Sequence, residues 1–275
     1  MQPTDEVAEG RFVHEVPLVV DFSTERELRL RFEAGRKIYN ALLGEALRRI
    51  KRTRHELRAH NALRLSCKAE ADKAIAENEL HVASPEARKI RKLAYKPYND
   101  IRNVLLKAYQ CSRFGLSAYG TKLSRETPLW APQHAVGATV VQELVRRAWL
   151  AAEKYLLDPR IECKFIRYGE LHSVESMNDS DAIRVVDDRV IWSSGRGGSV
   201  ISMRMRLDRK HRDWVEHHAR RAEIVKTRLV RRTIQGRLRY FAQIVLAGTP
   251  VERPWLTTIL GADIGIDLGL SIVAY

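Results

Sequence analysis

The acid best suited to chemistry lies near the end of the chain. Asp267 occupies the centre of the run Gly-Ile-Asp-Leu-Gly at 265–269, with a glycine two residues to either side. An acid in an apolar stretch that glycines allow to bend suits the tip of a buried strand, where one carboxylate reaches a metal ion or a phosphate. A strand that ends in an ordinary turn has the same pattern, so the spacing alone leaves both interpretations open.

Three histidines offer a second set of possible metal ligands. His211, His217 and His218 alternate with arginines and lysines in an amphipathic run. No nearby cysteine or carboxylate has the spacing of a metal site. We therefore interpret these histidines as part of a solvated helix face.

Positive charge gathers around one predicted turn, Gln235-Gly236. A two-residue loop that ends in glycine predicts a tight hairpin between strands at 224–233 and 237–246. Alternation along these strands would place charge on one face and the core on the other. Because neighbouring cations repel one another, we interpret the cluster as a contact for a phosphate backbone. The residues predicted to bind nucleic acid are Lys226, Arg228, Arg231, Arg232, Arg237, Arg239 and Tyr240, with Lys164 and Arg167 extending the surface.

The elements before residue 160 are predicted to be one strand followed by helices. The strand covers 11–22, and the residues from Ser23 to Glu27 predict a helix start directly after it. Apolar residues at helical spacing then predict that 24–158 are almost wholly helical, ending in a long helix at 132–157. Pro97 is expected to end or kink one helix, and residues 111–130 are expected to form turns. The basic face at 48–58 is interpreted as solvated.

The composition changes after residue 160. Short runs at 163–168, 182–186, 190–192 and 200–207, with the two hairpin strands, are predicted to be strands because clusters of Gly, Asp, Asn and Ser separate them. Short strands of this kind predict a barrel or a sandwich.

Size and charge narrow the function. The chain has 275 residues and 45% hydrophobic content, enough for a substantial core. Lys and Arg number 48 against 34 Asp and Glu, which gives a net charge of +14 and indicates a polyanionic partner. Because no run of 18 apolar residues is present and the first residues are acidic and polar, we expect no membrane association and a cytoplasmic location. Three isolated cysteines favour neither a disulfide framework nor a zinc site.

Taken in order, these features resemble the TnpB family of transposon-encoded RNA-guided nucleases and the related type V CRISPR effectors. The resemblance is carried by the hairpin segment 228–246 and by Gly-Ile-Asp-Leu-Gly-Leu at 265–270, with support from 165–176. It implies an α+β protein whose helical recognition-type domain, 23–159, is inserted in a wedge-type, OB-like β-barrel formed by 1–22 and 160–260. Residues 261–275 would be the first strand of a RuvC-like nuclease domain, which has an RNase H-like fold.

The resemblance also implies roles for these parts. The wedge would hold the guide RNA scaffold and help to read the DNA beside the target, and the recognition domain would cradle the guide–target heteroduplex. Base pairing then supplies sequence specificity, so the protein needs basic, shape-matched surfaces. Asp267 matches the first catalytic acid of the nuclease, one of several carboxylates that hold two Mg²⁺ ions.

The sequence departs from the family in one decisive respect. The other nuclease carboxylates and the Cys-x-x-Cys zinc module belong to later segments than those present here. Because one carboxylate cannot hold two metal ions, we expect this chain alone to bind guide RNA and target DNA without cutting it. It would be the N-terminal half of a longer nuclease, a split protein with a C-terminal nuclease partner, or a derivative that only binds.

Two alternatives remain open from the sequence. Actin-like and heat-shock ATPases open their phosphate-binding strand with the same Gly-Ile-Asp-Leu-Gly, although there it lies near the start of the chain and continues into Thr- and Ser-rich contacts. A basic nucleic-acid-binding protein without catalytic ancestry would also explain the charge and the hairpin. Co-purification of an RNA of defined structure would favour the guide-RNA hypothesis over the second alternative.

Overall fold

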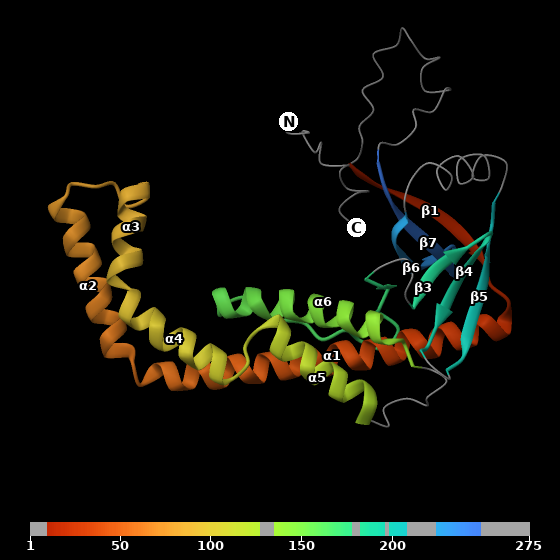
Figure 1. The fold of residues 1–275 in the computed structure, drawn as a ribbon, viewed down its shortest axis with the longest axis horizontal. Coiled ribbons are helices and arrows are strands. Elements are labelled where there is room, and N and C mark those ends of the chain that lie inside the picture. The colour runs from red at the N-terminus through yellow and green to blue at the C-terminus, as the bar shows by residue number, and fades with distance from the viewer. Residues whose placement is uncertain (1–9, 127–134, 178–181, 196–197, 208–223, 249–275) are drawn as a thin grey trace, which may run out of the picture.

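The computed structural model describes residues 10–126, 135–177, 182–195, 198–207 and 224–248. They form an α+β arrangement in which one strand is followed by a series of helices and then by further strands (Figure 1). The helices are α1 (Phe22–Arg58), α2 (Asn61–Glu77), α3 (Pro85–Ala94), α4 (Lys96–Ala108), α5 (Arg113–Glu126) and α6 (Ala138–Leu157). The strands are β1 (Arg11–Val19), β2 (Ser173–Glu175), β3 (Ile183–Val186), β4 (Arg189–Ser193), β5 (Val200–Met205), β6 (Ile224–Ile234) and β7 (Arg237–Ala247).

The first strand leads directly into a helix of 37 residues, as the sequence predicts. The predicted strand is slightly too long, because α1 begins at Phe22. Asp21 is the N-cap, and its carboxylate accepts a hydrogen bond from the Thr24 backbone N–H at 2.7 Å. This bond satisfies one of the N–H groups that a helix start leaves without a partner.

α1 organises the core because it contacts both the other helices and the sheet. One of its faces buries a row of large apolar side chains, including Leu28, Phe32, Leu42 and Ile50. This face packs against α5 and α6 along much of its length and against β5 near its start. The rings of Phe32 and of Trp192 on β4 are nearly perpendicular, with 5.8 Å between ring centroids, so helix and sheet share one core.

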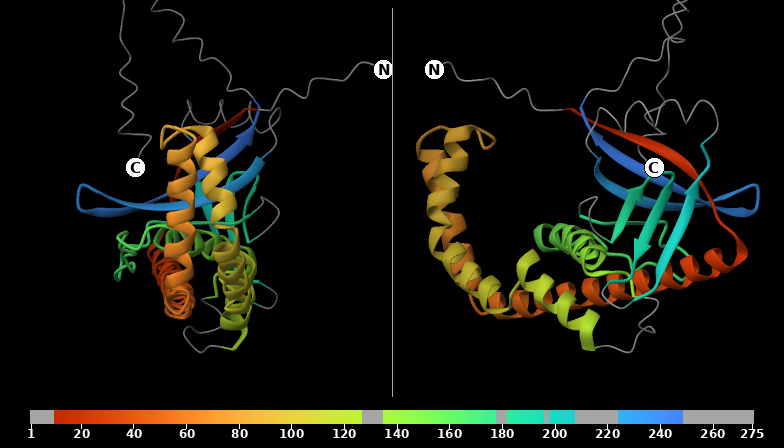
Figure 2. Two further views of the ribbon diagram at one scale, coloured as in Figure 1. Left: turned by 90° about the vertical axis from the view of Figure 1, so that its left-hand side faces the viewer. Right: turned by 45° about the vertical axis from the view of Figure 1, so that its right-hand side comes forward.

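Three helices, α2, α3 and α4, form an arm at the C-terminal end of α1. The predicted helix break lies just before Pro97: α3 ends at Ala94, and Pro97 occupies the first turn of α4, where its missing N–H costs nothing. Figures 1 and 2 show α2 and α3 rising from one end of α1 while the sheet lies at the other, so the molecule has a concave side.

Two predictions around the helical part are wrong. Residues 111–130 do not form only turns, because α5 covers Arg113–Glu126. The small residues that suggested turns allow close helix packing: a Cβ on Gly120 would lie 2.9 Å from Val145 Cγ2 on α6. The last helix begins at Ala138, not at 132, and follows Gly137, whose φ of +89° favours glycine.

The strands form one seven-stranded sheet with the order β2-β6-β7-β1-β5-β4-β3, and every pairing is antiparallel. The sheet is rolled: β3, at one edge, also contacts β6, and Ser176 just after β2 donates a hydrogen bond to the carbonyl of Ile183 on β3 at 2.9 Å. The prediction of a β-rich second part is therefore confirmed.

One predicted strand is absent. Residues 163–168 run along the helices instead of pairing in the sheet. Ile166 exchanges hydrogen bonds with the side chain of Asn40 on α1, both at 2.9 Å, and its carbonyl also accepts one from Arg36 at 3.1 Å. Helix side chains thus replace the neighbouring strand as hydrogen-bond partners.

The predicted tight hairpin is confirmed. β6 and β7 pair as far as Ile234 and Arg237, and the two residues between them, Gln235 and Gly236, both have positive φ, at +51° and +74°. Two such residues give a turn whose twist matches that of paired strands. The β6–β7 hairpin projects beyond the body of the protein (Figure 2).

Candidate nucleic-acid interface

The hairpin divides its cations between two faces. On β6 the core face carries Thr227, Leu229 and Arg231, which are buried, so the prediction that all charge lies on one face is wrong for Arg231. Its Nε donates to the carbonyl of Leu171 at 2.8 Å, and its guanidinium lies 4.7 Å from the centroid of the Phe32 ring. A cation with these partners can remain in the core.

Tyr240 is the cross-strand neighbour of Arg231 and shares its burial. Only 4% of Tyr240 is exposed, and burial raises the pKa of its phenol. Burial also lowers the pKa of Arg231. Both residues therefore belong to the core in this conformation, and a nucleic acid on the surface would not contact them.

Lys226 and Arg228, on the outer face of β6, share one carboxylate. Glu175 on β2 accepts hydrogen bonds from Lys226 at 2.8 Å and from Arg228 at 2.9 Å, and Arg146 of α6 lies 3.6 Å away. Burial would raise the pKa of the Glu175 carboxyl, but the hydrogen bonds and charges of Lys226 and Arg228 outweigh burial and lower this pKa to about 2. These cations join β2, β6 and α6.

Arg232 also has an acidic partner. Its two terminal nitrogens donate to the two oxygens of Glu15 on β1 at 2.6 and 2.7 Å, a bidentate pair, and its guanidinium lies 5.2 Å from the Phe241 ring centroid. Glu15 also accepts a bond from Gln243 at 2.8 Å. Four of the six cations in the predicted cluster thus have a role in the fold.

Arg237 and Arg239 differ from these four. Both are exposed near the tip of the β6–β7 hairpin, and the guanidinium group of neither forms a hydrogen bond or an ion pair with any other residue that the structure describes. Arg239 is paired directly across from Arg232, and such like-charged neighbours repel. The Glu15 carboxylate offsets that repulsion. The two exposed guanidinium groups have the shape and charge that phosphate oxygens bind.

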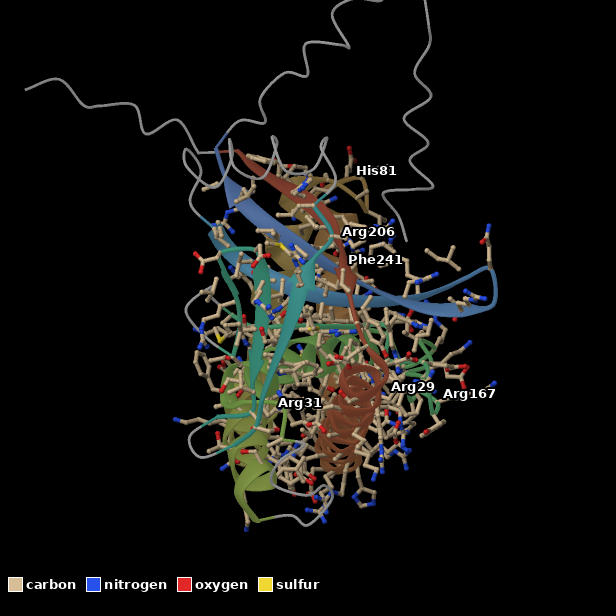
Figure 3. All side chains as sticks on the ribbon, turned by 90° about the vertical axis from the view of Figure 1, so that its right-hand side faces the viewer. Arg29, Arg31, His81, Arg167, Arg206 and Phe241 are labelled. Atoms are coloured by element: carbon tan, nitrogen blue, oxygen red, sulfur yellow. The ribbon has the colours of Figure 1, made fainter. Side chains whose placement is uncertain are left out.

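Lys164 and Arg167 are also exposed, in the segment that Asn40 and Arg36 hold against α1. Figure 3 shows Arg167 on the side of the molecule toward which the β6–β7 hairpin projects. The structure thus places Arg167 on the same side of the molecule as Arg237 and Arg239.

The predicted metal ligand is Asp267. Asp267, the proposed nuclease strand at 261–275 and the three histidines of 211–218 lie outside the described residues. Within the described ranges, no group of three or more His, Cys, Asp or Glu side chains could hold a metal ion. The Mg²⁺ site stays a prediction from the family resemblance. None of the helices described is long and apolar enough to cross a membrane.

One basic surface was not predicted from the sequence. A cavity of about 710 Å³ lies at the elbow where the ends of α1 and α6 meet the start of α2 and α4. Four arginines from three helices line it: Arg54, Arg58, Arg64 and Arg102. The sequence offered only a run of cations at 48–58, which we interpreted as solvated. Arg48 and Arg49 do pair locally with Glu45, whereas Arg54 and Arg58 face the cavity.

No protein-family model matches this chain, and no curated protein sequence matches it either. Function is therefore inferred from the residues and surfaces of the chain itself.

Proposed function

We propose that this chain binds nucleic acid as the RNA-guided DNA-binding portion of a TnpB-like or type V endonuclease. The carrying observation is the β6–β7 hairpin: its inner cations are neutralised or buried, while Arg237 and Arg239 project without a carboxylate partner among the described residues. An exposed pair of guanidinium groups on a projecting two-stranded hairpin, in a chain of net charge +14, suits a phosphate backbone.

The rolled sheet would correspond to the wedge-type barrel and the helices to the recognition-type domain. In this proposal the hairpin, with Lys164 and Arg167, contacts the guide RNA scaffold, while the concave side between the arm and the sheet receives the guide–target heteroduplex. Support comes from the shape in Figure 1, where α1 separates the arm from the sheet along its length. A protein whose guide supplies the sequence specificity needs this kind of shape-matched contact.

Binding, not catalysis, is the role that the described residues support. Cleavage would require a complete nuclease site with several carboxylates around Mg²⁺, and Asp267 would be one of them. A C-terminal nuclease segment or partner would supply the others. No step of that reaction is assigned to the residues described above.

The test is RNA sequencing of protein purified from its native host. We expect one RNA of defined structure to co-purify, and we expect Arg237→Gln with Arg239→Gln to reduce its recovery several-fold, since two phosphate contacts are removed. The matched control is Arg29→Gln with Arg189→Gln, two exposed arginines outside the β6–β7 hairpin, which should leave recovery nearly unchanged.

Each outcome has a distinct meaning. A heterogeneous RNA population would replace the guided function with that of a general nucleic-acid-binding protein. Absence of RNA, together with no measurable binding of RNA or DNA in vitro, would overturn the proposal altogether. Equal losses in the two double variants would show that overall charge acts, without a hairpin site.

A further inference from the structure

The cavity at the elbow, named here the elbow cavity, has a lining that the fold alone does not explain. Its walls come from the ends of α1 and α6, the start of α2 and the region around α4. The lining residues are Thr53, Arg54, Leu57, Arg58, Asn61, Arg64, Tyr95, Tyr98, Asn99, Arg102, Leu156, Leu157 and Pro159. Among the described residues, four arginines line it and no carboxylate does. Like charges brought together from separate helices raise the energy of the folded chain unless an anion offsets them.

One of these arginines has a structural role. Arg54 donates to the carbonyls of Tyr155 and Leu156 at the end of α6, and its guanidinium lies 4.2 Å from the Tyr155 ring centroid. It therefore satisfies carbonyl groups that a helix end leaves without partners and complements the negative end of the helix dipole.

The other arginines have no equivalent partner. Arg64 donates to the side chain of neighbouring Asn61 at 3.1 Å, a contact between exposed groups that leaves its charge uncompensated. The side chains of Arg58 and Arg102 form no hydrogen bond or ion pair with any residue in the described part of the chain. Arg58 also lies in the last turn of α1, where a cation is favourable, but this does not explain Arg102 on α4.

Aromatic and apolar groups lie beside these charges. Tyr95 and Tyr98 line the elbow cavity and are half-buried, and Leu57 and Leu157 add apolar surface. Tyrosine rings next to arginines form the usual combination for holding a nucleotide: bases stack on the ring while guanidinium groups bind the phosphate. A volume of about 710 Å³ is within the ordinary range for sites of small ligands.

The cationic surface continues along the arm. A second cavity, of about 530 Å³, shares Tyr95 and Asn99 with the elbow cavity and runs between α2 and α3. Its lining holds Lys68, Arg88, Arg91 and Lys92 against one acid, Asp72. A sugar–phosphate backbone that left the elbow cavity would therefore meet further cations along the arm.

We infer that the elbow cavity binds one nucleotide of a single-stranded nucleic acid, with its phosphate on Arg58 and Arg102 and its base against Tyr98. A single strand is specified because a base must be unstacked to lie on a tyrosine ring. This inference rests on the proposed function. It adds that a single-stranded nucleic acid is bound, and it names the site and the residues that contact the nucleotide.

The test is fluorescence anisotropy of the purified 275-residue chain with labelled oligo-dT and oligo-rU. We expect Arg58→Gln with Arg102→Gln to weaken binding by roughly tenfold and to reduce the slope of log affinity against log salt by about one for each lost phosphate contact. The control is Lys51→Gln with Arg52→Gln, which removes the same charge from an exposed part of α1 outside the cavity. Its loss should be no more than about twofold, as expected for non-contacting surface charge.

A second variant separates stacking from charge. Tyr98→Ala should weaken binding by about 5- to 100-fold without changing the salt slope, whereas Tyr98→Phe should restore it, because a phenyl ring also stacks. Circular dichroism before and after each substitution confirms that the fold is kept.

The elbow site would be overturned if the Arg58/Arg102 variant and the Lys51/Arg52 control lost equal affinity, or if Tyr98→Ala kept wild-type affinity. Either result would leave the proposed function intact. Failure of the wild-type chain to bind any RNA or DNA would remove both. Saturable binding of free AMP that displaces no oligonucleotide would contradict a strand site and indicate a small-molecule site instead.

Discussion

Glu175 shows how a single residue changes the meaning of a basic cluster. It is a carboxylate with 4% exposure surrounded by Lys226, Arg228 and Arg146, so cations that suggest a nucleic-acid surface in the sequence are partners of a buried acid. The opposite charges attract each other more strongly because burial removes water that would otherwise screen them. Glu175 thereby connects two strands to α6.

Glu175→Gln should destabilise the protein by roughly 2–3 kcal/mol at neutral pH, because Lys226 and Arg228 lose their carboxylate, whereas Arg146 keeps its closer partner, Glu143. The cost lies at the low end for a buried pair because these cations remain partly exposed to water. The free energy of unfolding from urea denaturation measures it. Glu77→Gln is the control: its pair with Lys73 is fully at the surface, so a change below about 0.5 kcal/mol is expected.

The same residue predicts a pH dependence. Since the pKa of Glu175 is lowered in the folded state to about 2 from an ordinary 4.5, the unfolded chain takes up its proton first as the pH falls. Its stabilisation is therefore complete above about pH 5 and is lost progressively toward pH 2. The difference in unfolding free energy between wild type and Glu175→Gln should shrink over that window. A difference that stays constant down to pH 2.5 would mean that the carboxylate charge is not the cause.

At the scale of elements, two helical glycines make opposite predictions. Gly120 lies on α5 where a Cβ would be 2.9 Å from Val145 Cγ2 and 3.4 Å from Leu42 Cδ2, so α5 packs closely on both α6 and α1. Gly44 lies within α1, and its Cβ would meet only the Phe165 ring, at 3.8 Å.

Gly120→Ala should therefore destabilise the protein by about 1–2 kcal/mol, because the clash exceeds the gain in helix propensity. Gly44→Ala should instead stabilise it by about 0.5–1 kcal/mol, since the contact is ordinary and the unfolded chain loses freedom. Urea midpoints of the two variants check both. Stabilisation by Gly120→Ala would show that the α5–α6 contact is looser than described.

The elements that the sequence predicts well are those fixed by neighbouring residues. The strand before α1, the helix break at Pro97 and the hairpin turn at Gln235-Gly236 all follow from local backbone preferences. The strand predicted at 163–168 fails because its hydrogen-bond partner, Asn40, lies 126 residues earlier. Local propensity contains no information about such a partner.

The candidate nucleic-acid interface also has parts that neighbouring residues predict and parts that depend on residues far away in the sequence. The composition around the turn identifies the cluster, but it does not show that Arg232 pairs with Glu15, which is 217 residues away, or that Arg231 faces Phe32. The elbow cavity needs the ends of four helices to meet, so no single stretch of sequence could indicate it. Arg232, Arg237, Arg239, Lys164 and Arg167 keep the exposure that the prediction assumed, but Arg232 is already paired with Glu15.

At the scale of the whole molecule, stability is unevenly distributed. The large core joins α1, α5, α6 and the sheet, whereas α4 has no buried residue and α3 buries only Ala87. The arm is thus held by few apolar contacts. Segments of this kind open at lower free energy than a well-packed core.

Hydrogen–deuterium exchange should show this difference. We expect backbone amides of α2, α3 and α4 to exchange well before those of α6 and β7 in the free protein, because local opening of the arm exposes little core. Added oligo-rU should slow exchange in the arm, because the elbow cavity lies there. Equal protection of arm and core in the free protein would contradict the uneven distribution.

The position of β1 has a consequence for how the chain is made. β1 lies between β7 and β5, and its longer pairing is with β7, where Arg11 pairs with Ala247. The first described strand thus pairs mainly with the last described strand. The helices between them can assemble from local contacts during translation. β1 cannot complete its pairing until β7 has left the ribosome, and until then its unpaired edges are open to chaperones and to other nascent chains.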